Sequence, residues 1–274
     1  MLPIKKMYVD SKYKTKDSVS NANFKITLPQ TMYMPDNTVF YIDDVVIPHS
    51  WYTVEYFNSK LYLSIFVSAN GRDQHIIELT KQVYNGSTLA TEIASNITAI
   101  GYTSIVTYNA SKQTISISLE DVHFKFLTDD ELRAEHPVWP WTGKSYDKNY
   151  LQSANGLVKS IESKSTIHNT GNPFIAFIDL QPIRNIYIKS PNLGNFNTLG
   201  SRGECDIIKK VSVSSDYGQM IFNNSLVSND FLDCSRQTLR TLEFILTDSA
   251  GHEIPFHGSF VSFSIIFDQM DKDI

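Results

Sequence analysis

Two adjacent carboxylates are the first residues in this sequence that could do chemistry. Asp43 and Asp44 stand side by side, and glycoside hydrolysis uses a pair of carboxylates that flank one bond. The residues around them, 39–47, are apolar on both parities and predict a β-strand. Because neighbouring side chains on a strand point to opposite faces, the two carboxylates cannot act on one bond. We therefore interpret this pair as structural.

A second acidic cluster invites a metal-site interpretation. Asp129, Asp130 and Glu131 follow one another and could offer oxygen ligands to Ca²⁺. No EF-hand spacing surrounds them, and Thr128 with Glu131 has the spacing of a helix capping box. Acidic residues in a first helical turn interact favourably with the helix dipole. We expect a helix start here and no calcium site.

Residues Thr142–Ser145 (TGKS) imitate the end of a phosphate-binding loop. That motif requires a glycine five residues before Gly143, where this chain has Val138. The nearby Pro137 and Pro140 are also incompatible with a tight nest of backbone N–H groups. The match is therefore interpreted as accidental.

Histidines and nucleophiles give no better site. His252 and His257 are the closest histidine pair, but no cysteine or third histidine lies near them, which makes a zinc site improbable. The chain has no G-x-S-x-G nucleophile elbow. We expect no catalytic residue, no metal and no cofactor, and hence no enzyme.

Composition narrows the class of protein. Charged residues make up 19% of the 274 residues, against about 25% in typical domains, and the net charge is −5. A dedicated nucleic-acid binder would normally be basic. There is no apolar run of about 18 residues, so no membrane span is expected, and no secretory signal is visible near Met1. The two cysteines, Cys205 and Cys234, are expected to be free, with Cys205 buried.

Apolar residues alternate with polar ones along most of the chain, as in Phe24, Ile26 and Leu28. This period of two is typical of antiparallel sheets stacked as a sandwich. We predict an all-β fold, a single antiparallel jelly roll with an eight-stranded core, spanning residues 21–274, with an inserted α+β or loop region at about residues 70–172. Two short helices are predicted, at Thr88–Ile100 and Asp129–Glu135, with Ser87 as N-cap of the first and Gly101 as its stop.

The first twenty residues differ from the rest in charge, with five lysines against Asp10 and Asp17. Residues 1–20 are expected to form an N-terminal arm. It is either a solvated tail or a basic arm that docks on an acidic neighbouring protein or, more weakly, on packaged DNA.

Aromatic residues are common in predicted loops, where protein interfaces and carbohydrate-binding sites both use them. The candidate assembly contacts are the basic and aromatic residues of the arm and the loop tryptophans and tyrosines: Lys5, Lys6, Tyr8, Lys12, Tyr13, Lys14, Trp51, Tyr52, Trp139 and Trp141.

Both ends of the chain resemble a known family. The stretches concerned are Tyr8–Tyr13 (YVDSKY), Ser20–Pro29 (SNANFKITLP), Tyr41–Tyr52 (YIDDVVIPHSWY), Leu242–Gly251 (LEFILTDSAG) and Gly258–Ile265 (GSFVSFSI). Together they look like the penton, or minor capsid, proteins of virophages, Polintons (Mavericks) and adintovirus-like elements. The resemblance covers about half of the chain and includes no catalytic signature.

The resemblance implies a function. In that family a single jelly roll forms homopentamers at the fivefold vertices of an icosahedral capsid, beside trimers of a double-jelly-roll major capsid protein. It therefore implies a virion protein assembled inside the host cell. Two alternatives remain: a receptor- or carbohydrate-binding jelly-roll module, and a cupin-like enzyme, whose His/Glu metal constellation this sequence lacks.

Overall fold

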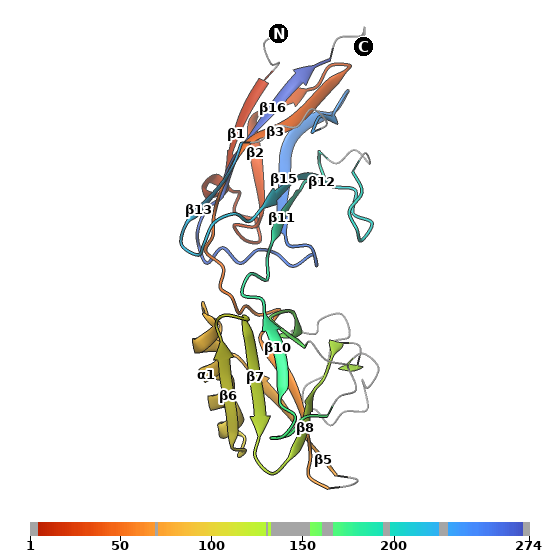
Figure 1. Cartoon of the computed structure of the whole chain (residues 1–274). Coiled ribbons are helices and arrows are strands. Elements are labelled where there is room, and N and C mark those ends of the chain that lie inside the picture. Colours follow the sequence, from red (N-terminus) through yellow and green to blue (C-terminus); the bar gives the residue numbers. More distant parts are fainter. Residues whose placement is uncertain are drawn as a thin grey trace. The chain divides into compact units, whose positions relative to one another are not determined.

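The computed structural model describes residues 5–68, 71–129, 131–132, 154–160, 167–193, 198–224 and 230–270 (Figure 1). The chain divides into two compact units. Unit 1 comprises Met1–Trp51 and Ile183–Ile274, and unit 2 comprises Tyr52–Pro182. No helix in the described ranges has both the length and the apolar character needed to cross a membrane.

Unit 1 is a two-sheet β-sandwich. Its strands are β1 (Lys5–Asp10), β2 (Asn23–Tyr33), β3 (Thr38–Pro48), β11 (Asn185–Lys189), β12 (Ile207–Ser212), β13 (Met220–Asn223), β14 (Leu232–Asp233), β15 (Thr238–Thr247) and β16 (Ser262–Gln269). One sheet has the order β1-β16-β3-β13, with the short β14 also paired to β3, and the other has the order β12-β11-β15-β2.

This strand order is that of a jelly roll. If the eight long strands of unit 1 are numbered along the chain, the sheets read 1-8-3-6 and 5-4-7-2, the arrangement that two interlocked Greek keys produce. All pairings between them are antiparallel. The predicted all-β jelly roll is therefore confirmed.

The core of unit 1 lies between the two sheets and is rich in phenylalanine. Phe24 and Phe244 face each other across β2 and β15, with ring centroids 5.6 Å apart. Phe244 also meets Phe263 of the opposite sheet at 5.0 Å. Alternation explains the packing, because every second residue of these strands turns inward. β3 lies centrally as predicted, but only one of its parities is fully buried and the other is half-buried.

The structure corrects our prediction of an N-terminal arm. Residues 5–10 form β1, which pairs with β16 from Lys5↔Phe267 to Asp10↔Ser262. Val9 turns into the core and is 2% exposed, and the short helix η1 (Ser11–Tyr13) follows with its first residue buried. The lysines misled the prediction because charged residues also protect the open edge of a sheet from further strand pairing.

Unit 2 is inserted between β3 and β11. It contains β4 (Lys60–Phe66), β5 (Arg72–Glu78), α1 (Gly86–Ala99), β6 (Ser104–Asn109), β7 (Thr114–Leu119), β8 (His123–Phe126), η2 (Ala154–Gly156), β9 (Val158–Ser160) and β10 (Phe174–Ile178). Its sheets have the orders β5-β4-β8 and β6-β7-β10-β9, and share a core with α1. The unit begins and ends outside the range of 70–172 that the sequence suggested.

The helix predicted at Thr88–Ile100 is present as α1. Asn85 caps it instead of Ser87, since the Asn85 side chain accepts a hydrogen bond from the N–H of Thr88 in a capping box. Gly101, with φ of 93°, follows the helix as predicted. At the second helix, the Thr128 hydroxyl accepts a hydrogen bond from the N–H of Glu131, as a capping box requires. Most of the range Asp129–Glu135 lies outside the described residues.

Both cysteines are free thiols, as predicted. Cys234 is fully buried, and this burial raises the pKa of its thiol to about 12. Cys205 is only half-buried and precedes β12, so our expectation that it faces the core was wrong.

The burial of Val9 gives a direct test of β1. We expect Val9→Ala to lower the free energy of unfolding of unit 1 by about 1–3 kcal/mol, because it leaves a void in the core. Lys5→Ala on the exposed part of the same strand should change it by less than about 0.5 kcal/mol. Urea denaturation followed by tryptophan fluorescence would measure both. Equal, negligible effects would mean that β1 does not contribute to the folded unit.

Candidate assembly surface

The outward surface of the sheet β1-β16-β3-β13 is the candidate functional site, and we call it the outer face. Its members are the outward-pointing residues of three strands: Lys6, Tyr8, Tyr41, Asp43, Val46, Met220 and Phe222. On β1, alternation turns Val9 inward and leaves Tyr8 outward, opposite Ser264 and 76% exposed.

The opposite edge of the same sheet is also apolar. Phe222 lies opposite Val46 and Met220 opposite Pro48, while Ile221 between them is buried in the core. Phe222 is 70% exposed and Met220 is 45% exposed. Single exposed apolar residues are ordinary, but two on one four-residue strand form an apolar edge to the face.

One ion pair crosses the outer face. The Lys6 ammonium donates a hydrogen bond to an Asp43 carboxylate oxygen at 2.9 Å, and this bond raises the pKa of Lys6. Lys6 also lies 5.5 Å from the centroid of the Tyr8 ring. Half-buried Tyr41 packs edge-on against Phe231 with centroids 5.0 Å apart, and burial raises the pKa of its hydroxyl. The resulting surface combines aromatic rings, which are enriched at the centres of protein interfaces, with one ion pair between Lys6 and Asp43.

A register shift changes our interpretation of the two adjacent carboxylates. Between the pairs Phe263↔Val45 and Ile265↔Ile42, both Asp43 and Asp44 lie opposite Ser264, which forms a β-bulge. The strict alternation that we used to separate them is interrupted at this point. Asp43 instead forms an ion pair with Lys6 on the outer face. Its role is therefore still structural, but the reason is this ion pair and not strand alternation.

The predicted contacts of the first segment divide between two places. Lys5, Lys6 and Tyr8 lie on β1, whereas Lys12 and Tyr13 lie in η1 and are exposed. Lys14 follows η1 and is half-buried. Its ammonium donates to the Asn21 side chain at 2.6 Å and lies 5.9 Å from the Phe260 ring centroid.

Trp51 does not lie on the surface. It is 2% exposed, stacks on His49 with centroids 4.1 Å apart and meets Phe256 edge-on at 6.3 Å. Its indole is thus a core group of unit 1, which corrects its prediction as an assembly contact. Tyr52 belongs to unit 2, is half-buried and donates its backbone N–H to Glu55 at 2.7 Å. Trp139 and Trp141 lie outside the described residues.

The residues that suggested catalysis or metal binding have other partners. Asp129 accepts a hydrogen bond from Asn155 at 2.9 Å, and Glu131 accepts one from Lys125 at 3.0 Å. His252 lies 2.9 Å from Asp248 in the turn between β15 and β16. Among the residues described, no three His, Cys, Asp or Glu side chains group closely enough to hold a metal ion. The TGKS segment is not among them.

Sequence reasoning missed Met220 and Phe222. The only available signal was the placement of two large apolar residues on one parity of the four-residue run MIFN, with Ile221 on the other. Such a run is too short for alternation to define which parity faces the core.

The chain is similar to solved structures of known proteins. One of these is the crystal structure of the selenomethionine-labelled mavirus penton protein, with a TM-score of 0.48 and 10% sequence identity, covering 97% of this chain and 100% of that chain. No family model matches the sequence. The curated proteins also contain no significant match.

The burial of Trp51 yields a prediction that distinguishes a core residue from an assembly-contact residue. We expect Trp51→Ala to lower the free energy of unfolding by about 3–5 kcal/mol, because a large buried side chain is lost. Tyr13→Ala, at an exposed aromatic residue, should change it by less than about 0.5 kcal/mol. Chemical denaturation followed by circular dichroism measures both. A stable Trp51→Ala protein with altered self-association would restore Trp51 as a contact residue.

Proposed function

We propose that the protein is a structural virion protein, a penton that forms homopentamers at the fivefold vertices of an icosahedral capsid. Its neighbours in the shell would be trimers of a double-jelly-roll major capsid protein. The observation that carries the proposal is a complete single jelly roll with two exposed aromatic side chains, Tyr8 and Phe222, on its outer face. The proposed role requires binding surfaces and no catalytic group.

The family resemblance supports the proposal because the stretches that carry it lie together in the fold. The five matching stretches fall on β1, β2, β3, β15 and β16 and the residues beside them. All of these strands belong to unit 1, and unit 2 contributes only the single residue Tyr52. The resemblance therefore concerns the jelly roll as a unit.

Ring closure sets the kind of contact. Five copies related by a closed rotation must meet through two different surfaces of each subunit. We infer that the outer face supplies one of these surfaces. An interface of this kind should bury more than about 1,000 Å² in total. Lys5 of β1 and Lys12 of η1 would then lie beside the contact, where an acidic neighbour, or weakly the packaged DNA, could meet them.

The oligomeric mass tests the proposal. Native mass spectrometry of the purified full chain should give five times the chain mass of 31.1 kDa. A monomer or a trimer would favour the alternative of a receptor- or carbohydrate-binding module and would contradict the penton.

Truncating the aromatic residues tests the surface itself. Each of Tyr8→Ser and Phe222→Ser should weaken the pentamer by about 2 kcal/mol per contact, roughly thirtyfold, because exposed aromatics are frequent hot spots. Tyr33→Ser is the matched control, since Tyr33 is exposed on β2 of the other sheet. Analytical ultracentrifugation over a dilution series measures the dissociation. If the control dissociates the ring as strongly as the other two, the outer face is not the contact.

A further inference from the structure

The open edges of the sheets differ in how they are protected. An exposed edge strand presents unpaired N–H and C=O groups, and proteins usually prevent unwanted pairing with charged residues or proline. Most edge strands here have such residues: Lys5, Lys6 and Asp10 on β1, Lys25 and Pro29 on β2, Arg72, Asp73 and Glu78 on β5, and Lys209 and Lys210 on β12. β6, with the sequence SIVTYN, has none.

β6 is the longest uncharged edge in the described part of the chain. It pairs with β7 on one side, and none of the described strands pairs with its other side. The N–H of Glu120 donates to the carbonyl of Thr103, which identifies Thr103↔Glu120 as a hydrogen-bonded pair of this ladder. Because such pairs alternate, the backbone groups of Ser104, Val106 and Tyr108 point away from β7, toward the open edge.

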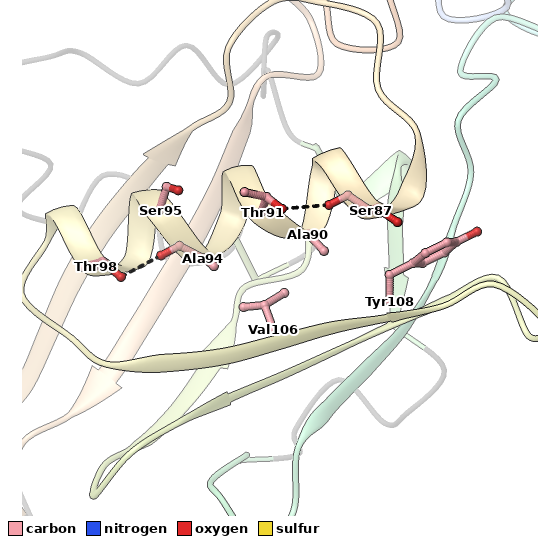
Figure 2. A pocket seen from close by; sticks show the side chains of 8 residues that line it. All are labelled: Ser87, Ala90, Thr91, Ala94, Ser95, Thr98, Val106 and Tyr108. Carbon is pink, nitrogen blue, oxygen red and sulfur yellow. Dashed lines mark hydrogen bonds between the residues drawn. The ribbon is translucent and has the colours of Figure 1, made fainter.

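A groove lies beside this edge. It has a volume of about 600 Å³ between α1 and β6, and Figure 2 shows the side chains that line it: Ser87, Ala90, Thr91, Ala94, Ser95, Thr98, Val106 and Tyr108. None of them is charged. The ring of Tyr108 packs directly against Gly86, where a side chain on the glycine would collide with it.

Two of the four hydroxyl groups that α1 contributes to the groove are hydrogen-bonded within the helix. The Thr91 hydroxyl donates to the carbonyl of Ser87 at 3.1 Å, and the Thr98 hydroxyl donates to that of Ala94 at 3.0 Å. The helix therefore presents small side chains and methyl groups to the groove (Figure 2). A charged group placed there would meet no opposite charge among the lining side chains.

We propose that the open edge of β6 binds an extended, uncharged segment of a partner polypeptide. The segment adds to the sheet as a further strand, and its main chain hydrogen-bonds to Ser104, Val106 and Tyr108. Alternate side chains of the segment enter the groove under α1. They are uncharged and β-branched, because the groove is lined by small, uncharged side chains and offers no counter-charge.

A second copy of this chain cannot be the occupant through antiparallel two-fold pairing of β6 with itself. Paired strands lie about 4.8 Å apart, whereas a helix with its side chains is about 10 Å wide. α1 packs on β6, and the second copy would place its own α1 on the same face of the joined sheet. The two helices would collide, so the occupant must be a bare extended segment.

The test uses synthetic peptides and the full chain. The probe is a fluorescein-labelled, end-capped peptide of alternating Thr and Val, and its comparison peptide has Glu in place of each Val. Fluorescence polarisation should show binding of the first peptide and at least tenfold weaker binding of the second. Hydrogen exchange should show new protection at the amides of Ser104, Val106 and Tyr108 when the first peptide is bound.

Two variants locate the site. Ala94→Arg places a long charged side chain in the groove and should weaken binding at least tenfold. Ala99→Arg adds the same side chain to the last residue of the same helix, outside the groove lining, and should leave binding unchanged. Failure of the first peptide to protect β6, equal binding of both peptides or equal effects of the two variants would each overturn the proposal. So would protection of β6 by self-association without peptide.

This proposal does not depend on the penton function. All of its residues lie in unit 2, and the contacts proposed for the pentamer lie in unit 1. Ala94→Arg should therefore leave the oligomeric mass unchanged, so failure of one proposal can be distinguished from failure of the other.

Discussion

The packing of β16 between β1 and β3 is the interaction on which unit 1 depends. This strand is the last one in the described part of the chain, yet it lies inside its sheet and pairs with β1 and β3. Its inward residues Phe263 and Phe267 meet Phe244 of the opposite sheet and Phe40 of β3. The sandwich therefore closes only when the two ends of the sequence meet. Since the strands on either side of the insertion lie in different sheets, a whole unit can be accommodated between Trp51 and Ile183 without interrupting a strand pair.

Much of this fold could be predicted from alternation alone. The strand expected at residues 39–47 is β3, Thr38–Pro48, and α1 is displaced by only a residue or two from its predicted range. β1 was missed because an edge strand with one buried residue, Val9, among lysines has the composition of a solvated tail. Pairing with β16 supplies the stability that its own six residues lack, and such a long-range partner is not visible in a local pattern.

The candidate site was less predictable than the fold. Tyr8 was identified because it is aromatic and lies close to the chain start. Trp51 was misassigned because it follows a strand and resembles a loop residue, although His49 and Phe256 enclose it. Phe222 was missed because its strand is too short to define a face. In each case the deciding quantity is burial by residues distant in sequence, which single-sequence patterns do not encode.

One physical rule connects the surfaces of the two units: an open strand edge needs either charges that repel further pairing or a partner that completes it. On β1, Lys6 is one of the charged residues that discourage further strand pairing, and it also forms an ion pair with Asp43. A subunit that covered the outer face would therefore desolvate an ion pair rather than two separate charges. On β6 no charge is present, and α1 takes over part of the protection, since its width prevents antiparallel pairing with a second copy. Between α1 and β6 lies the groove whose small, uncharged lining we propose to receive the side chains of the added strand. The uncharged edge of β6 thus cannot pair with β6 of a second copy, but it can pair with an extended segment of another chain.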